Sequence, residues 1–339
     1  MGCFRLLLLL AAAVALVPAR ADSTIAPPPV RFDLKRPEIK TFIDDVAQRH
    51  SLSRGELTKL LASAEPQPKI IEIMTRPAER VLAWWEYRAL FVNEERVALG
   101  VQFWQDHREE LERIATERGV APEYIAAIIG VETKYGRIMG RYRVLDALTT
   151  LAFDYPPRSD YFRKELEEFV LLTREESIDP SKALGSYAGA MGGAQFMPSR
   201  YRRYAVDSGD DQHRDLWEDW GDVFASVANY FREFGWEPGG AVLAEVDLDP
   251  EPTFTIDTRN RTLNETIGSL RTQGVETRTD APAETPVLLV SAEQAEGPAY
   301  RVGFKNFEVI TQYNRSARYA MAVNDLAQAI ALRVRGSTP

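Results

Sequence analysis

The sequence is poor in cysteine and histidine. Cys3 is the only cysteine among 339 residues, and the three histidines, His50, His107 and His213, lie far apart. A lone cysteine excludes an intrachain disulfide framework, and scattered histidines give no obvious zinc site. Beyond the first residues, no apolar run reaches the length of about 18 residues that a membrane-spanning helix needs.

Basic residues are outnumbered by acidic ones, which gives a formal net charge of −9. Nucleic-acid-binding proteins normally carry a basic patch, so this balance argues against a nucleic-acid partner. The chain is long enough for two or three domains at roughly 100–200 residues each.

The N-terminus has the parts of a secretory signal. Arg5 is followed by an apolar run of 12 residues at 6–17 and by Ala-Arg-Ala at 19–21. We therefore predict a signal peptide at 1–21, cut at its end, with an uncleaved anchor as the alternative. Cys3 precedes the apolar run, whereas a lipidated cysteine would follow it, so lipidation is not predicted.

Most of the remaining chain has helical periodicity. After a proline-containing flexible arm at 22–36, apolar residues recur at helical spacing up to about 235, with a helix start at Ser53, three residues before Glu56. Another helix is expected at about 316–335. Between these helices, short β-favouring runs predict a small β region, at Ala241–Val246, Thr253–Ile256, Val287–Val290 and Phe307–Ile310.

One acidic residue lies on an apolar helix face. Residues 121–136 have the first-turn proline and the terminal glycine of a helix. Glu132 follows Ile129 by three positions and Ile128 by four, so all three share one side. Burial on that side would raise the pKa of the carboxyl and keep it protonated near neutral pH, as a general acid requires. The alternatives are an ion pair with Lys134 or a distant arginine, or exposure at the helix end.

A glycine-rich segment follows at 185–201. Glycine and serine are frequent in it, so its backbone can approach a ligand closely. Ser186 and Gln195 could hydrogen-bond a sugar or an acetamido group, and Phe196 could pack on a sugar face. The segment lacks the G-K-[ST] ending of a phosphate loop. Close helix packing over small residues is the alternative.

Several motifs together resemble the membrane-bound lytic transglycosylase B family (glycoside hydrolase family 103). They are GVETKYG at 130–136, YAGAMGGAQFMPS at 187–199, DLW at 215–217, SVANYF at 226–231 and ITQYNRS at 310–316. The likeness extends over roughly residues 35–335, and it is the set of motifs that is specific. It implies a periplasmic enzyme, in a soluble form, that cleaves peptidoglycan.

The resemblance implies an α+β fold that is mainly α. A lysozyme-like helical core would occupy 113–235. An accessory helical domain would combine 37–112 with 298–336, and a small inserted β domain would occupy 236–297.

The resemblance also assigns residues to the site. Glu132 would be the single catalytic acid and base. The sugar-binding groups would be Ser186, Gln195, Phe196, Tyr230, Tyr313 and Asn314, with Tyr319 as a weaker candidate. Arg158, which follows Tyr-Pro-Pro, is a further weak candidate for contact with stem peptides.

The implied reaction breaks the β-1,4 bond between N-acetylmuramic acid (MurNAc) and N-acetylglucosamine (GlcNAc) and closes a 1,6-anhydro ring. A retaining glycosidase would need a second carboxylate about 5 Å away, and the motifs offer no obvious one. The partners would be glycan strands, with other cell-wall enzymes left open, and the protein would act as a monomer without a required cofactor. A hydrolytic muramidase on the same scaffold and a non-catalytic wall-binding protein are the alternatives.

An acidic loop at 207–222 could supply oxygen ligands, which calcium prefers. Following the resemblance, its ligands would be Asp207, Asp211, the His213 carbonyl and Asp222. The loop lacks the glycine at position six and the glutamate at position twelve of an EF-hand. A solvated acidic loop is the alternative.

Overall fold

The computed structural model describes residues 30–76, 82–209, 211–257 and 260–336. The chain divides into two units, Met1–Val30 and Arg31–Pro339, and all the described helices and strands belong to the second. The predicted signal peptide lies outside the described residues. Within them, no helix combines the length and the apolarity needed to cross a membrane.

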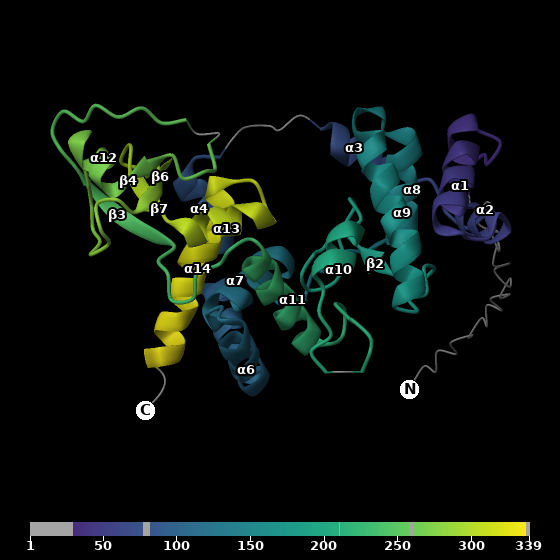
Figure 1. Cartoon of the computed structure of the whole chain (residues 1–339), viewed down its shortest axis with the longest axis horizontal. Helices are drawn as coiled ribbons and strands as arrows, with labels where there is room; N and C mark the ends of the chain where they lie inside the picture. Colours follow the sequence, from purple (N-terminus) through teal and green to yellow (C-terminus); the bar gives the residue numbers. More distant parts are fainter. Residues whose placement is uncertain (1–29, 77–81, 210, 258–259, 337–339) are drawn as a thin grey trace, which may run out of the picture. The chain divides into compact units, whose positions relative to one another are not determined.

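The described chain is mainly helical (Figure 1). The helices from the first described residues to the one that contains Glu132 are α1 (Pro37–His50), α2 (Arg54–Ala62), α3 (Pro68–Thr75), α4 (Trp84–Phe91), α5 (Glu94–Asp106), α6 (Arg108–Arg118) and α7 (Pro122–Thr133). Those that follow are α8 (Val144–Asp154), the 3-10 turn η1 (Pro156–Arg158), α9 (Ser159–Glu175), α10 (Pro198–Tyr204), α11 (Trp220–Glu233), α12 (Ile267–Thr272), α13 (Lys305–Tyr313) and α14 (Ala317–Gly336).

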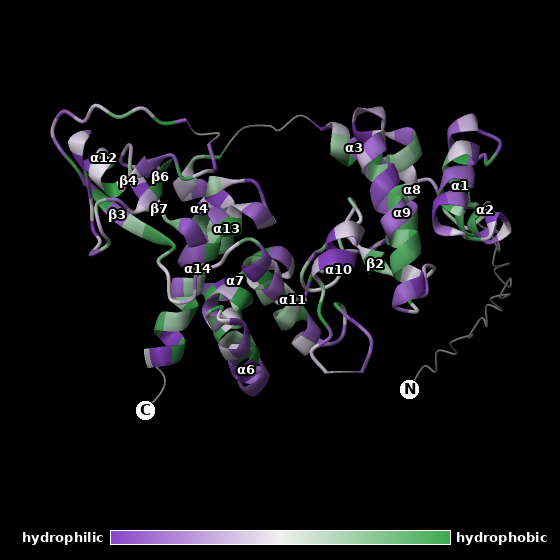
Figure 2. Cartoon of the chain, viewed as in Figure 1, coloured by the Kyte–Doolittle hydropathy of each residue, from purple (hydrophilic) through white to green (hydrophobic). Residues whose placement is uncertain are grey.

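Local chemistry accounts for several helix starts. The Ser53 hydroxyl accepts a hydrogen bond from the Glu56 amide at 3.3 Å, which confirms the predicted start of α2. Asn93 and Asp219 cap α5 and α11 in the same way. Figure 2 shows polar and apolar residues alternating along α6 and α9, as expected of helices that bury one face.

The strands form two antiparallel sheets. In the smaller sheet, β1 (Tyr142–Arg143) pairs with β2 (Leu184–Gly185) and so ties the start of the glycine-rich segment to the chain that follows α7. The larger sheet has the order β4-β6-β7-β3-β5. Its strands are β3 (Leu243–Leu248), β4 (Glu265–Thr266), β5 (Val275–Thr277), β6 (Pro286–Ser291) and β7 (Tyr300–Gly303).

The larger sheet has a hydrophobic core of its own. Val275, Val287 and Val302 are buried there with Leu270 of α12, apart from the main cluster of buried residues. The sheet extends from residue 243 to 303, whereas the predicted β domain ends at 297. The predicted domain boundaries themselves stay a prediction.

Two of the four predicted β runs are wrong. Thr253–Ile256 has no regular structure, and Phe307–Ile310 lies within α13. In α13 the helical spacing lets Phe307 and Ile310 share one buried side, and this packing overrides the β preference of the run. The fold class, α+β and mainly helical, is confirmed.

Helix α7 lies among the other helices of the main core. It packs against α14, and also against α5, α6 and α11. Because α14 comes from the far end of the chain, this contact brings residues near 319 against residues near 132. The packing of α7 on α14 therefore decides which groups surround the predicted catalytic carboxyl.

Candidate active site

Glu132 lies in the last turn of α7, on the predicted apolar face. Ile125, Ile128 and Ile129 are fully buried, whereas Glu132 keeps part of its surface exposed. Glu132 thus lies at the end of a buried stripe and, as a residue, is only partly buried. A buried helix that ends at the surface positions such a group rigidly.

The chain turns sharply directly after Glu132. Lys134, Tyr135 and Gly136 all have positive φ, at 51°, 60° and 77°. Such backbone is unfavourable for residues other than glycine and is concentrated at functional sites. The turn carries Lys134 away, and its Nζ lies 2.6 Å from Oε1 of Glu95. Lys134 therefore forms its ion pair with Glu95 and not with Glu132, as the alternative had supposed.

Tyr319 of α14 makes the direct polar contact to the carboxyl. Its hydroxyl donates to Oε1 of Glu132 at 2.6 Å, and its side chain is only 2% exposed. The short bond and the buried ring fix the orientation of the carboxyl. Tyr319 was a weaker candidate from the sequence, and the structure places it against Glu132.

Burial raises the pKa of Glu132 to about 7. The hydrogen bond from Tyr319 and the positive charge of Arg200 act in the opposite direction, but they do not cancel the loss of solvent. A carboxyl with a pKa near neutral pH is protonated often enough to act as an acid and ionised often enough to act as a base.

Arg200, at the start of α10, supports the backbone opposite Glu132. Its guanidinium donates to the carbonyls of Tyr313 and Gln312 at 2.9 and 3.2 Å, and lies 5.3 Å from the ring centre of Tyr230. The arginine thus holds the segment that contains Asn314. Sequence reasoning did not single out Arg200, although it lies near the end of the glycine-rich segment at 185–201.

The predicted polar residues of the glycine-rich segment are partly exposed. Ser186 accepts hydrogen bonds from the amides of Ala188 and Ala190, at 3.3 and 3.0 Å, through its hydroxyl oxygen. The Gln195 side-chain amide donates to the carbonyls of Met139 and Gly192. The Ser186 proton and the Gln195 carbonyl oxygen take part in none of these bonds, so both can serve a ligand.

Three of the predicted sugar-binding aromatics are buried together. The rings of Phe196, Tyr230 and Tyr313 lie with centres 4.9–5.8 Å apart, and none is more than 5% exposed. The hydroxyls of Tyr230 and Tyr313 donate to the carbonyls of Gln312 and Ala194, each at 2.6 Å. These side chains pack behind the exposed residues of the site.

Asn314 and Arg158 are exposed. The Arg158 guanidinium lies 4.5 Å from the ring centre of Tyr161. Burial raises the pKa of Tyr161 to about 12, while the charges of Arg158 and Arg200 both lower it. Arg158 and Arg200 are thus both close enough to Tyr161 for their charges to act on its hydroxyl. Tyr161 was not predicted as a site residue.

Tyr87 of α4 is a third residue, after Arg200 and Tyr161, that the sequence did not predict. Burial raises the pKa of its hydroxyl, and the charge of Glu132 raises it further, so the two groups are near one another. No motif includes Tyr87, and only the packing of α14 on α4 brings it to the site.

The carboxylates of the acidic loop hold the loop's own backbone. Asp222 accepts from the amides of Ser208 and Asp215, both at 2.7 Å, and Asp207 accepts from two further amides. Asp211 accepts from the amide of His213 at 2.8 Å. With Asp210 outside the described residues, the others include no group of three acidic, histidine or cysteine side chains arranged to hold a metal ion.

The chain is similar to known proteins over most of its length. The sequence profile of the Transglycosylase SLT domain matches residues 35–328. Membrane-bound lytic murein transglycosylase B of Escherichia coli (strain K12) is 39% identical over 307 residues, which cover 87% of this chain and 83% of that protein. The crystal structure of soluble lytic transglycosylase SltB1 from Pseudomonas aeruginosa is 44% identical, with a TM-score of 0.84, and covers 89% of this chain and 100% of its own.

Two further solved structures include ligands. The Escherichia coli lytic transglycosylase Slt35, in complex with calcium, is 38% identical with a TM-score of 0.82, over 91% of this chain and 97% of that one. SltB3 from Pseudomonas aeruginosa, in complex with NAG-NAM-pentapeptide, is 27% identical with a TM-score of 0.77, over 86% and 78%. The enzyme class predicted from the motifs is confirmed: the chain belongs to the transglycosylase SLT family of lytic transglycosylases.

Proposed function

We propose that this lytic transglycosylase cleaves the MurNAc-β-1,4-GlcNAc bond with Glu132 as acid and then base. The observation that carries the proposal is the carboxyl of Glu132, a partly buried residue, whose pKa is about 7 and whose orientation Tyr319 fixes. The charged group that acts on it is a cation, Arg200. A two-carboxylate retaining mechanism would instead need a second acid about 5 Å away.

The protein's part in the reaction is to move one proton. Glu132 donates it to the bridging oxygen, the bond between that oxygen and C1 of MurNAc breaks, and GlcNAc leaves with a free 4-hydroxyl. The substrate's 2-acetamido group stabilises C1. The Glu132 carboxylate then takes the proton from the MurNAc 6-hydroxyl, whose oxygen bonds to C1. The 1,6-anhydro ring forms without water, and Glu132 is protonated again.

Four exposed or partly exposed residues are proposed to hold the sugars and their peptides: Ser186, Gln195, Asn314 and Arg158. Phe196, Tyr230 and Tyr313 are buried, so we assign them the role of supporting Gln195 and Asn314 from behind.

Replacing Gln195 with Glu would test the proposed contact between this side chain and the sugar. It should raise KM for glycan strands about tenfold, because a carboxylate cannot donate to the carbonyls of Met139 and Gly192 and repels them, so the side chain leaves the position in which its oxygen meets the sugar.

The site of action is proposed to be the periplasm, reached through the signal at 1–21, with the protein acting as a monomer on glycan strands. The mass of the protein recovered from a periplasmic extract tests this. A mass that starts at residue 22 agrees with the proposal, and a mass that still includes residues 1–21 contradicts the cleavage.

The loop at 207–222 is proposed to bind calcium only after rearranging, because its aspartates accept backbone hydrogen bonds as it stands. One observation favours binding. Burial is the main cause of the raised pKa of Asp222, and the negative charges of Asp219 and Asp207 raise it further, so negative charge is concentrated there. No step of the reaction involves the ion. Calorimetry should detect heat on adding calcium, and its absence at millimolar concentration would exclude the site.

A further inference from the structure

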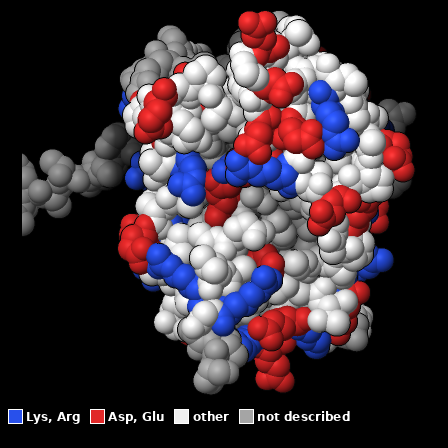
Figure 3. All heavy atoms as spheres, turned by 90° about the vertical axis from the view of Figure 1, so that its left-hand side faces the viewer, with Lys and Arg blue, Asp and Glu red and all other residues white. Residues whose placement is uncertain are grey.

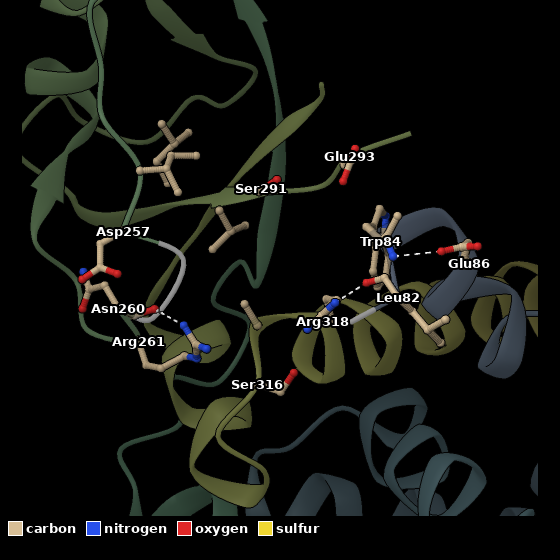
Figure 4. A pocket seen from close by; sticks show the side chains of 15 residues that line it. Leu82, Trp84, Glu86, Asp257, Asn260, Arg261, Ser291, Glu293, Ser316 and Arg318 are labelled. Atoms are coloured by element: carbon tan, nitrogen blue, oxygen red, sulfur yellow. Dashed lines mark hydrogen bonds between the residues drawn. The ribbon is translucent and has the colours of Figure 1, made fainter. Parts of the chain in front are cut away.

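Two cavities of similar volume lie along helix α14. The cavity in Figure 4, of about 520 Å³, is lined by Arg318 near the start of the helix, directly before Tyr319, and so adjoins the active site. The other, of about 510 Å³, lies along the C-terminal part of α14, against the start of α7 and the segment that joins α11 to β3. None of the residues predicted for catalysis or sugar binding lines this second cavity.

The second cavity is separated from Glu132 by most of the length of α7. The helices α7 and α14 pack antiparallel, because Tyr319 near the start of α14 bonds to Glu132, whereas Arg335 near its end pairs with Glu123 at the start of α7. Glu123 precedes Glu132 by nine residues, which corresponds to about 14 Å at about 1.5 Å per residue. A ligand in this cavity would therefore not contact the catalytic carboxyl.

Two buried polar atoms in the lining have no hydrogen-bond partner among the described residues. They are Oε2 of Glu123 and the indole N–H of Trp236, and these residues are only 6% and 7% exposed. Oε1 of Glu123 accepts a hydrogen bond from Arg335 at 2.9 Å, so the second carboxylate oxygen is the one left over. Buried polar groups without a partner are rare in folded proteins, and this pair favours a ligand that supplies both a donor and an acceptor.

The rest of the lining favours a neutral ligand. In the described part of the chain its charged residues are Glu123 and Arg335, which pair with each other. Its other polar side chains are neutral: Asn324 accepts from the Tyr124 hydroxyl at 3.0 Å, and Gln328 donates to that hydroxyl at 3.1 Å. Gln328 is exposed, so it lies where a ligand would enter. Apolar surface comes from Ala121, Val242 and Leu243.

We propose that this cavity binds the acetamido group of an N-acetylglucosamine residue, as a second glycan-binding site remote from Glu132. The acetamido N–H donates to Oε2 of Glu123, the acetyl oxygen accepts from the Trp236 indole, and the methyl group packs on the apolar lining. The Arg335 side chain is 71% exposed, so Glu123 can turn toward the ligand at little cost to the ion pair. Cell-wall peptides also contain amides, but they carry charges for which the described lining offers no unpaired partner.

The inference does not depend on catalysis, so it is tested in Glu132→Gln protein. The probe is N,N′-diacetylchitobiose, and the signal is the NMR resonance of the Trp236 indole N–H, identified by its absence from Trp236→Phe protein. The resonance should move downfield and saturate with a Kd on the order of 1 mM, as expected of a few net hydrogen bonds. Cellobiose, a disaccharide without acetamido groups, is the matched control ligand and should leave the resonance in place.

Variants then locate the bound sugar. Glu123→Met removes the carboxylate at similar length and should raise the Kd about tenfold, and Gln328→Ala at the exposed edge should raise it about threefold. Gln102→Ala changes an exposed glutamine of α5 that bonds to Asp106 outside the cavity, and it should leave the Kd unchanged. Gln195→Glu, which is expected to weaken glycan binding at the active site, should also leave it unchanged.

A resonance that stays in place with diacetylchitobiose, or moves equally with cellobiose, would overturn the inference. So would a Kd that rises in Gln195→Glu protein and not in the Glu123→Met and Gln328→Ala proteins, because the resonance would then report on the active site. Movement with a peptide released from the cell wall, and none with the disaccharide, would reject the sugar as the occupant. Failure of the proposed function would appear separately, as turnover that survives in Glu132→Gln protein.

Discussion

At the scale of single residues, the proton affinity of Glu132 is set by burial and by two neighbours. Burial raises its pKa to about 7, and Tyr319 and Arg200 lower it. Each of these contributions can be changed without touching the carboxyl, so each can be measured from the dependence of activity on pH.

Replacing Tyr319 with Phe should raise the pKa of Glu132 further. The hydroxyl stabilises the ionised carboxyl, so its loss favours the protonated form by about one pKa unit. The basic limb of the kcat/KM profile, where the acid is lost, should move to higher pH. Tyr124→Phe is the control, because that hydroxyl bonds to Asn324 near the other end of α7. An unchanged limb, or one moved to lower pH, would contradict the assignment.

Replacing Glu132 with Gln should stabilise the fold at high pH. The pKa of the carboxyl is raised from 4.5 to about 7 on folding, so the folded state binds more protons within that range. Stability of the wild type is therefore lost as pH rises through it, by about 1–3 kcal/mol in total. The variant lacks this cost. Urea unfolding should show no difference at pH 4 and a more stable variant at pH 8, and equal stability at both would refute the raised pKa.

Among single residues, periodicity alone could place Glu132 on an apolar face, because Ile128 and Ile129 define that face locally. It could not find Tyr319, which lies 187 positions away in sequence. Tyr319 entered only through the family resemblance, while Arg200, Tyr161 and Tyr87 entered only through the fold. Contacts between distant segments depend on packing that no local pattern encodes.

At the scale of elements, the glycine-rich segment is held by backbone contacts at close range. Gly192 has φ of 65°, and a Cβ placed there would lie 2.2 Å from the carbonyl oxygen of Leu216. The neighbouring amide of Gly193 donates to that same carbonyl at 2.6 Å. The segment therefore needs glycine at this position for the approach of two backbones, both of which lie in turns and not in helices.

Gly192→Ala should destabilise the fold by about 2–4 kcal/mol and reduce activity, because both the positive φ and the clash with Leu216 penalise alanine. Gly239→Ala is the matched control. Gly239 has a similar φ of 72° but nothing within 4 Å of the added Cβ, so only about 1 kcal/mol should be lost. Thermal unfolding of both variants separates clash from backbone strain. Equal losses would mean that the close approach is relieved by a small shift.

The elements that sequence patterns predicted best were the helices with local caps, such as α2 with Ser53. The β region was predicted less well. Phe307–Ile310 has the β-branched composition of a strand, yet it lies in α13, where burial of Phe307 and Ile310 decides. Strands as short as β4 and β5 have too few residues to show alternation, so they exist only through their partners in the sheet.

At the scale of the whole molecule, a net charge of −9 opposes approach to an anionic cell wall. Figure 3 shows acidic and basic side chains interspersed on one face, with neither sign forming a single field there. The repulsion between the protein and the cell wall thus arises from the net charge of the molecule and not from one acidic patch on this face. Salt should therefore screen it.

The kcat/KM on intact sacculi should therefore rise about two- to threefold as ionic strength increases from about 0.01 to about 0.15 M, where the Debye length falls from about 30 to about 8 Å. Short oligosaccharides of GlcNAc and MurNAc, which carry few charges and so feel little of this repulsion, serve as the control substrate. A decrease with salt on sacculi would instead indicate a locally basic binding surface.

The most direct test of the account is mass spectrometry of sacculi digested by the wild type and by Glu132→Gln protein. The wild type should release muropeptides lighter by one water than hydrolytic products, because the 6-hydroxyl of MurNAc replaces water at C1. The variant should release none above background while remaining folded. Products of hydrolytic mass from the wild type, or more than a few per cent of wild-type turnover from the variant, would contradict the role assigned to Glu132.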